Sequence, residues 1–306
     1  VVPTTDNYDW TKAREHWAWR PVKKVIPPTV SGARVRNPID QFVAEGLYNE
    51  GLRQSPEAKA SVFVRRVFLD LVGLPPTPDE LSEWTQQLGG NTAGELNDQA
   101  VSMLVDSLLN RPQYGERWGR HWLDVARYSD AGGWTQDNRS HPKAWQYRDW
   151  VVRAFNADLP YDQFVRQVVS AEGNAVQNGA SVVFRDRPMP EDVATLVARV
   201  FLGVHIECAR CHHHPLDKWS QEDFYQFAAF FGQVKQQGQR GNKGLTIFHS
   251  GEGEMKHPMT QEVMHPTPLD GTFATIAPRS GFYSSKNRKR TTPDSDTDHS
   301  GPRTDR

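Results

Sequence analysis

The chain is 306 residues long, with 37% hydrophobic residues and a formal net charge of -1 at pH 7. This length allows a substantial core and one or two domains, and the balance of 36 basic against 37 acidic residues argues against nucleic acid or an anionic membrane as the main partner. No apolar run approaches the roughly 20 residues of a membrane-spanning helix, so we expect no membrane span.

Residues 1–36 are predicted to form an extended N-terminal arm. Trp10, Trp17 and Trp19 stand among charged residues, and the prolines of this stretch discourage regular structure. Because large aromatic side chains are costly to leave in water, we expect the arm to lie over the domain that follows.

Residues 37–232 are predicted to form a helical domain of about eight helices. The first three helices have start signals at Asn37-Pro38, Ser55-Pro56 and Thr77-Pro78, and a fourth ends near Pro112. Apolar residues recur at intervals of three and four behind these signals, so we expect scaffold helices that each bury one face. The inward positions of the first helix are Ile39, Phe42, Val43 and Leu47, and those of the others include Val64, Phe68, Leu81, Trp84, Leu104 and Leu108.

One of the next helices carries a candidate site residue. A helix over residues 116–128 carries an aromatic stripe, which usually indicates core, and His141-Pro142 and residue 161 open two more helices. Residues 171–190 lack any pattern, so we expect an irregular connection that runs over the surface next to a site. The stripe consists of Trp118, His121, Trp122, Val125 and Tyr128.

A regular helix is predicted to begin at Pro190, with acidic residues in its first turn. Apolar residues follow at intervals of three and four as far as Val204, and the same spacing reaches Cys208, Cys211 and His212. The pattern therefore predicts that these three residues prolong the buried face of one helix.

Cys208 and Cys211 are the only cysteines of the chain, and with His212 they form the Cys-x-x-Cys-His signature of c-type haem attachment. Two thiols one turn apart can add across the two vinyl groups of one porphyrin, and the following histidine can bind the iron from one face. We predict two thioether anchors with His212 as the proximal ligand. His121 is a candidate distal ligand or haem-pocket residue, although a histidine in an aromatic stripe is more often part of the core.

Other interpretations of the same residues stay open. The two thiolates could bind zinc with His212 or His214, since thiolate and imidazole are the ligands that zinc prefers. No second cysteine pair is present to close a structural zinc site of the usual kind. The two cysteines could also form a disulfide, or the short pattern could occur by chance.

The rest of the chain changes in character. Ser220 caps a last helix, and Trp219 is a candidate for the other wall of a haem crevice or for ordinary core. Residues 233–278 are predicted to be an irregular, Gly-rich segment with short strands, one of them at 246–248. Residues 279–306 contain almost nothing apolar and are predicted to be disordered.

Several separated segments are similar to one bacterial family. The longest is GERWGRHWLDVARY at residues 115–128, and the others, in chain order, are 16–22, 37–40, 69–78, 147–151, 201–204, 208–215 and 223–225. Together they resemble a family of domains of unknown function, numbered 1549, which is abundant in planctomycetes. The resemblance covers roughly residues 16–235.

The resemblance implies an exported protein linked to cytochromes. Members of that family are usually large, with a planctomycete cytochrome c domain often before this one and a second uncharacterised domain after it. Cys208, Cys211, His212 and His214 match the family's own Cys-x-x-Cys-His-x-His-Pro pattern, and the cytochrome link favours haem. Residues 278–306 do not resemble the start of that second domain, which would fit a chain truncated or altered in reading frame there.

We therefore predict a mostly α-helical protein that carries one covalent haem. The expected function is electron transfer to a redox partner protein in the periplasm or outside the cell. The alternative is a zinc-dependent hydrolase or a zinc-stapled scaffold that uses Cys208, Cys211 and His214, with His121 as a further candidate ligand. The sequence identifies no catalytic residue and no oligomeric state.

Overall fold

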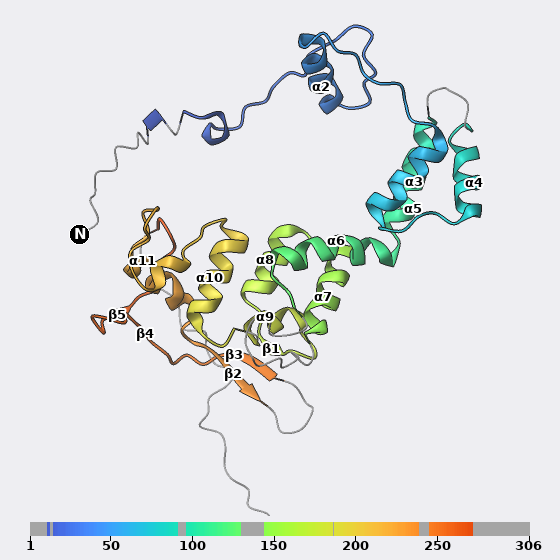
Figure 1. Ribbon diagram of the computed structural model, residues 1–306. Helices are drawn as coiled ribbons and strands as arrows, with labels where there is room; N and C mark the ends of the chain where they lie inside the picture. Colours follow the sequence, from blue (N-terminus) through green and yellow to red (C-terminus); the bar gives the residue numbers. More distant parts are fainter. Residues whose placement is uncertain are drawn as a thin grey trace, which may run out of the picture.

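The computed structural model describes residues 11–12, 15–90, 96–129, 144–185, 187–238 and 245–271. Over these residues the protein is mostly α-helical, with ten α-helices and a few short antiparallel strands, as predicted (Figure 1). No helix within these ranges combines the length and the apolar character needed to cross a bilayer. The predicted tail at 279–306 lies outside the described residues.

The N-terminal part is more exposed than predicted. A short 3-10 helix, η1 (Trp17–Trp19), precedes α2 (Pro38–Asn49), which starts with a capping box between Asn37 and Asp40. Trp17 is 78% exposed, so the expectation that the arm buries this tryptophan was wrong. Ile39 on α2 is 71% exposed and Ala44 is the one buried residue of the helix, so its predicted inward face is also wrong. In Figure 1, α2 stands apart from the later helices.

Three helices then form a small core of their own. They are α3 (Ala60–Leu71), α4 (Pro78–Gln87) and α5 (Asp98–Leu109). Their buried apolar side chains include Val64, Phe68, Leu88, Leu104 and Leu108. The capping box at Thr77 and the inward faces are confirmed, whereas α3 begins at Ala60, later than the Ser55-Pro56 signal indicated.

The next two helices, α6 (Pro112–Val125) and α7 (Trp145–Asn156), approach each other through glycines. Gly115 and Gly119 are buried on α6, and a Cβ atom at Gly115 would lie 2.4 Å from the backbone oxygen of Val152. This close contact determines which face of α6 is buried. The buried residues are the two glycines and Leu123, and not those of the predicted aromatic stripe. His121 and Val125, two members of that stripe, are exposed.

The connection at 171–190 is not the surface loop that the sequence predicted. After α8 (Tyr161–Val169) it forms β1 (Gly173–Asn174), η2 (Gly179–Ser181) and α9 (Val182–Arg185). Ala180, Val182 and Phe184 are buried in the core. A Cβ atom at Gly179 would lie 2.3 Å from the Gln146 carbonyl oxygen, so glycine lets this segment press against α7.

The last helices form a second large cluster around the motif. They are α10 (Pro190–Phe201), η3 (Glu207–Arg210), α11 (Gln221–Ala228) and η4 (Ala229–Phe231). The predicted continuous helix through Cys211 was wrong, because α10 ends at Phe201. Gly203 follows with φ of +67°, a left-handed conformation that glycine adopts without steric cost and that ends helices.

Short strands follow, as predicted. β2 (Val234–Gly238) and β3 (Leu245–His249) pair antiparallel, and β1 adds to the other edge of β3, which gives the order β1-β3-β2. Ile247 at the centre of β3 is fully buried and joins the cluster around α10 and α11. β4 (Met255–Lys256) and β5 (Val263–Met264) form a separate two-stranded pair.

Candidate functional site

The two cysteines lie on one 3-10 turn. Cys208 is inside η3, and Cys211, which follows its last residue, donates its backbone N–H to the Cys208 oxygen at 3.4 Å. Side chains three residues apart in a 3-10 helix are aligned along the axis, so both thiols project from the same side of the turn. Both are exposed and neither forms a disulfide. The turn thus presents two adjacent thiols to the solvent.

The opposite side of this turn is anchored to α10 at two points. Ala209 is fully buried between the cysteines. Arg210 donates to Asp192, in the first turn of α10, at 2.9 Å. Glu207 accepts from Arg199, near the end of α10, at 2.8 Å. Because the later residue of the turn contacts the earlier part of the helix, η3 runs back along α10 in the opposite direction.

A third anchor comes from α11. The Gln221 side-chain amide and the Tyr225 hydroxyl donate to the Arg210 backbone oxygen at 2.9 Å and 3.3 Å. Burial and the nearby charge of Glu191 raise the pKa of Tyr225. Burial alone would lower the pKa of Arg210, but its hydrogen bond to Asp192 and the surrounding negative charge raise it above the usual value. The phenol therefore stays neutral and the guanidinium charged around neutral pH.

His212 is oriented by the backbone of the next residue. Its ring Nδ1 lies 2.6 Å from the backbone oxygen of His213. A carbonyl oxygen can only accept, so Nδ1 must carry the proton and donate it. In the neutral ring this leaves the Nε2 lone pair unprotonated, which is the form in which a histidine binds a metal. The exposed imidazole thus offers a free nitrogen ligand on the residue that follows Cys211 in the chain.

In the next two histidines, Nδ1 accepts a hydrogen bond and does not donate one. His213 Nδ1 accepts from the backbone N–H of Gln221 at 3.2 Å, and His214 Nδ1 accepts from that of Leu216 at 3.2 Å. A backbone N–H can only donate, so in these neutral rings the proton is on Nε2. Of the three adjacent histidines, His212 alone is arranged to bind a metal through Nε2 without breaking a side-chain hydrogen bond.

Trp219 is a core residue with an unused donor. It is 7% exposed, and its backbone oxygen accepts from His214 N–H at 2.8 Å. The Lys218 ammonium lies 4.7 Å from the centre of its ring. The indole Nε1 is buried and has no hydrogen-bond partner within the described chain. Its packing in the core is confirmed, and a role facing a cofactor stays a prediction.

His121 lies on α6, where its ring centre is 5.5 Å from that of Trp118. Among the described residues, no three His, Cys, Asp or Glu side chains gather closely enough to hold a metal ion. The structure therefore gathers neither Cys208, Cys211 and His212 nor the two cysteines with His214 and His121 into one metal-ligand set. The residues that sequence reasoning missed are the anchors Asp192, Arg199 and Gln221, which become neighbours of the motif only through folding.

The family model named PSCyt2, described as a protein of unknown function (DUF1549), matches residues 38–236. The chain belongs to this family. The match includes the turn with its two thiols and all of its anchors on α10 and α11. The family name hints at a cytochrome-associated role and states no cofactor. No curated protein and no solved structure matches the chain.

Proposed function

We propose that this PSCyt2 member is a c-type haem protein that transfers electrons. The haem would be attached through Cys208 and Cys211, with His212 as a ligand to its iron. The observation that carries the proposal is the state of the His212 ring, whose Nδ1 donates to a backbone oxygen and whose Nε2 is free, directly after a turn with two exposed thiols in the chain. A bound haem would supply the reversible one-electron couple.

The residues of the turn suit covalent attachment. Each S–H would add across one vinyl group, so that a carbon–sulfur bond forms and the hydrogen goes to the neighbouring carbon, with no other product. The anchors to Asp192 and Arg199 hold the turn still while its thiols stay accessible. The buried Trp219 N–H has no acceptor among the described residues, and a haem propionate is one acceptor that a bound cofactor would bring.

Zinc is the less well supported cofactor for the same turn. A zinc site with His214 as a ligand through Nε2 requires its ring to give up the hydrogen bond from Leu216. It also requires a fourth ligand from elsewhere, since structural zinc sites are closed by four ligands. A haem needs no such fourth side chain.

The exposure of the motif fits exchange of electrons with another protein. Cys208, Cys211 and His212 are all exposed, so an attached haem would have an edge at the surface that a redox partner can approach. Covalent haem attachment takes place on the outer side of the cytoplasmic membrane, so the proposed site of action is the periplasm or the cell exterior.

The test is expression of the full chain, exported, with and without the c-type maturation machinery. We expect a band that stains for haem on a denaturing gel, and a mass increase of one haem, only when the machinery is present. Replacing both cysteines with alanine should remove the stain. His212→Ala should keep the stain and shift the absorption spectrum, while His213→Ala should leave the spectrum unchanged.

Measurements on the same preparations can also contradict the proposal. A colourless protein of unmodified mass under maturation conditions excludes a covalent haem. If metal analysis of that protein finds one zinc per chain that is lost in His214→Ala, the zinc interpretation takes its place.

A further inference from the structure

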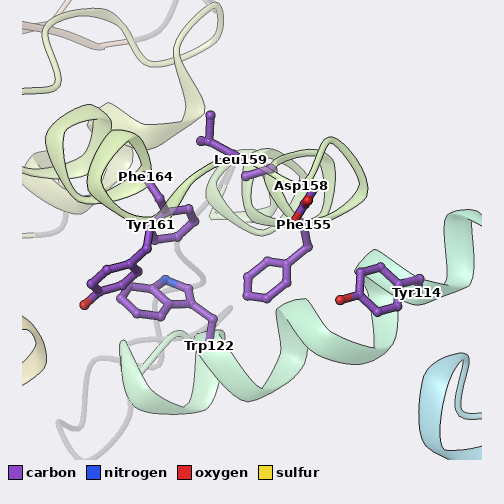
Figure 2. A pocket seen from close by; sticks show the side chains of 8 residues that line it. Tyr114, Trp122, Phe155, Asp158, Leu159, Tyr161 and Phe164 are labelled. Atoms are coloured by element: carbon purple, nitrogen blue, oxygen red, sulfur yellow. The ribbon is translucent and has the colours of Figure 1, made fainter. Parts of the chain in front are cut away.

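A second site lies away from the cysteines, in a cavity between α6, α7 and α8. The cavity has a volume of about 210 Å³ and its wall is mostly aromatic (Figure 2). Two of its residues come from α6, three from α7 and the turn after it, and the rest from α8 and its approach. The lining residues used below are Tyr114, Trp122, Phe155, Asp158, Tyr161 and Phe164.

Three of the rings around this cavity pack against one another. Trp122 meets Phe164 edge to face, with ring centres 4.7 Å apart, and Phe155 meets Phe164 at 6.3 Å. The indole N–H of Trp122 donates to the Tyr147 hydroxyl at 2.9 Å. The polar edge of the indole is thereby satisfied by the protein, and its ring also packs against Phe201 at 5.6 Å, so a ligand can meet only the part of the ring that lines the cavity. Figure 2 shows the Trp122 ring between Phe155 on one side and Tyr161 on the other.

The cavity carries one charged group, the carboxylate of Asp158. This residue has φ of +46°, and its N–H donates to the Phe155 oxygen at 3.1 Å, so it forms the left-handed turn that ends α7. The turn places an exposed acidic side chain at the mouth of the cavity, above Phe155 in Figure 2. Within the described chain Asp158 has no ion pair, and no lysine, arginine or histidine lines the cavity.

These features select a ligand by its chemistry. The faces of Trp and Tyr rings are negative, and they attract a cation whose charge is spread over an apolar surface. The carboxylate adds to this attraction and disfavours anions. The volume is below the range of roughly 300–1,000 Å³ of drug-sized sites, so the ligand must be small. We propose that this cavity binds a small quaternary ammonium cation, such as a free trimethylammonium compound.

The experiment is a calorimetric titration of the full chain with choline chloride. The control ligand is 3,3-dimethylbutan-1-ol, which has the same shape with a neutral carbon in place of the charged nitrogen. Sodium chloride at equal concentration controls for ionic strength. We expect saturable binding of choline at one site and at least tenfold weaker binding of the neutral alcohol.

Two variants locate the site. Tyr161→Ala and Asp158→Asn should each weaken choline binding by roughly 2- to 30-fold, which is the range of a cation–π or ion contact at a partly exposed site. Tyr161 is 63% exposed and asparagine tolerates the left-handed turn, so both proteins should keep the wild-type circular dichroism spectrum. Asp162→Asn, an exposed acidic residue on α8 outside the lining, should leave choline affinity unchanged.

The proposal is overturned by any of three results. They are the absence of saturable choline binding, equal affinity for choline and the neutral alcohol, and binding that none of the lining variants weakens. None of these results depends on whether the cysteines carry a haem.

Discussion

The guanidinium group of Arg210 donates a hydrogen bond to the carboxylate of Asp192 over 2.9 Å, which ties the turn with the two thiols to the first turn of α10. The two residues are eighteen positions apart in the chain. α10 packs its apolar face into a buried cluster that it shares with α11, so this contact links the exposed turn to a well-packed helix. A covalent cofactor at Cys208 and Cys211 would be held by the same link.

Asp192→Asn is expected to loosen the turn without unfolding the protein. Both partners are partly exposed, so the loss in stability should be about 1 kcal/mol or less. Amide hydrogen exchange over residues 206–211 should nevertheless become faster. The control is Asp162→Asn, which removes an exposed pair with Arg166 at 4.0 Å and should leave that exchange unchanged. Equal exchange in both variants would show that the Arg210 contact does not hold the turn.

Gly115→Ala is expected to destabilise the protein. The new methyl group would lie 2.4 Å from the Val152 oxygen and 2.6 Å from the side chain of Asn156, so α6 and α7 must move apart. Overpacking of this kind costs about 1–3 kcal/mol. Gly46→Ala in α2 is the matched control, since its added methyl meets nothing within 4 Å and should gain about 1 kcal/mol of helix propensity. Thermal melts should therefore shift in opposite directions.

The local features of this fold were predictable from the sequence. The capping boxes at Asn37, Thr77 and Ser220 all form, because a cap and its partner are three residues apart. The strand around Ile247 also forms where its β-branched and aromatic residues predicted. Such signals depend on residues close together in the chain, so they do not depend on the tertiary packing.

Most errors in the predictions from sequence come from contacts between residues far apart in the chain. The pairing of Gly173 with Ile247 and the approach of Gly179 to Gln146 bury a segment that has no regular pattern of its own. On α6, glycines rather than aromatic rings make the closest contact with α7. For α10 a local signal existed, since Gly203 is a typical helix-ending residue, but the apolar spacing continues past it to Val204 and predicted a longer helix. The Cys-x-x-Cys-His run was thus recognised by its residue types, while its placement on a separate turn was not predicted.

Glu80→Ala is expected to cost about 1–2 kcal/mol, because Glu80 serves two partners. It accepts from the Thr77 backbone N–H at 2.8 Å and from Arg111 at 2.6 Å. Glu80→Gln should cost less, since glutamine keeps the cap and loses the charge. The Thr77 hydrogen bond, followed by Arg111, lowers the pKa of Glu80 below 4.5. The advantage of glutamate over glutamine should therefore hold above pH 4.5 and vanish as the pH falls further, which urea unfolding at several pH values would reveal.

Tyr147 should give the protein a stability that is lost in strong alkali. Burial raises the pKa of this phenol from 10.0 to about 12, in spite of its hydrogen bond from Trp122. The folded state thus holds the proton more tightly than the unfolded state, so the contribution is complete below pH 10 and disappears as the pH rises towards 12. Two pKa units correspond to roughly 3 kcal/mol, an upper limit for a phenol that is not wholly shielded from water.

Comparison of wild type with Tyr147→Phe isolates this effect. The variant should be about 1 kcal/mol less stable at pH 8, because the indole N–H of Trp122 loses its acceptor. Its stability should then fall less steeply than that of wild type between pH 10 and 12, since it lacks the phenol that resists ionisation. Tyr48→Phe, at a tyrosine that is 72% exposed, should follow the wild-type curve throughout. Parallel curves for wild type and Tyr147→Phe, measured by urea unfolding across this range, would contradict the prediction.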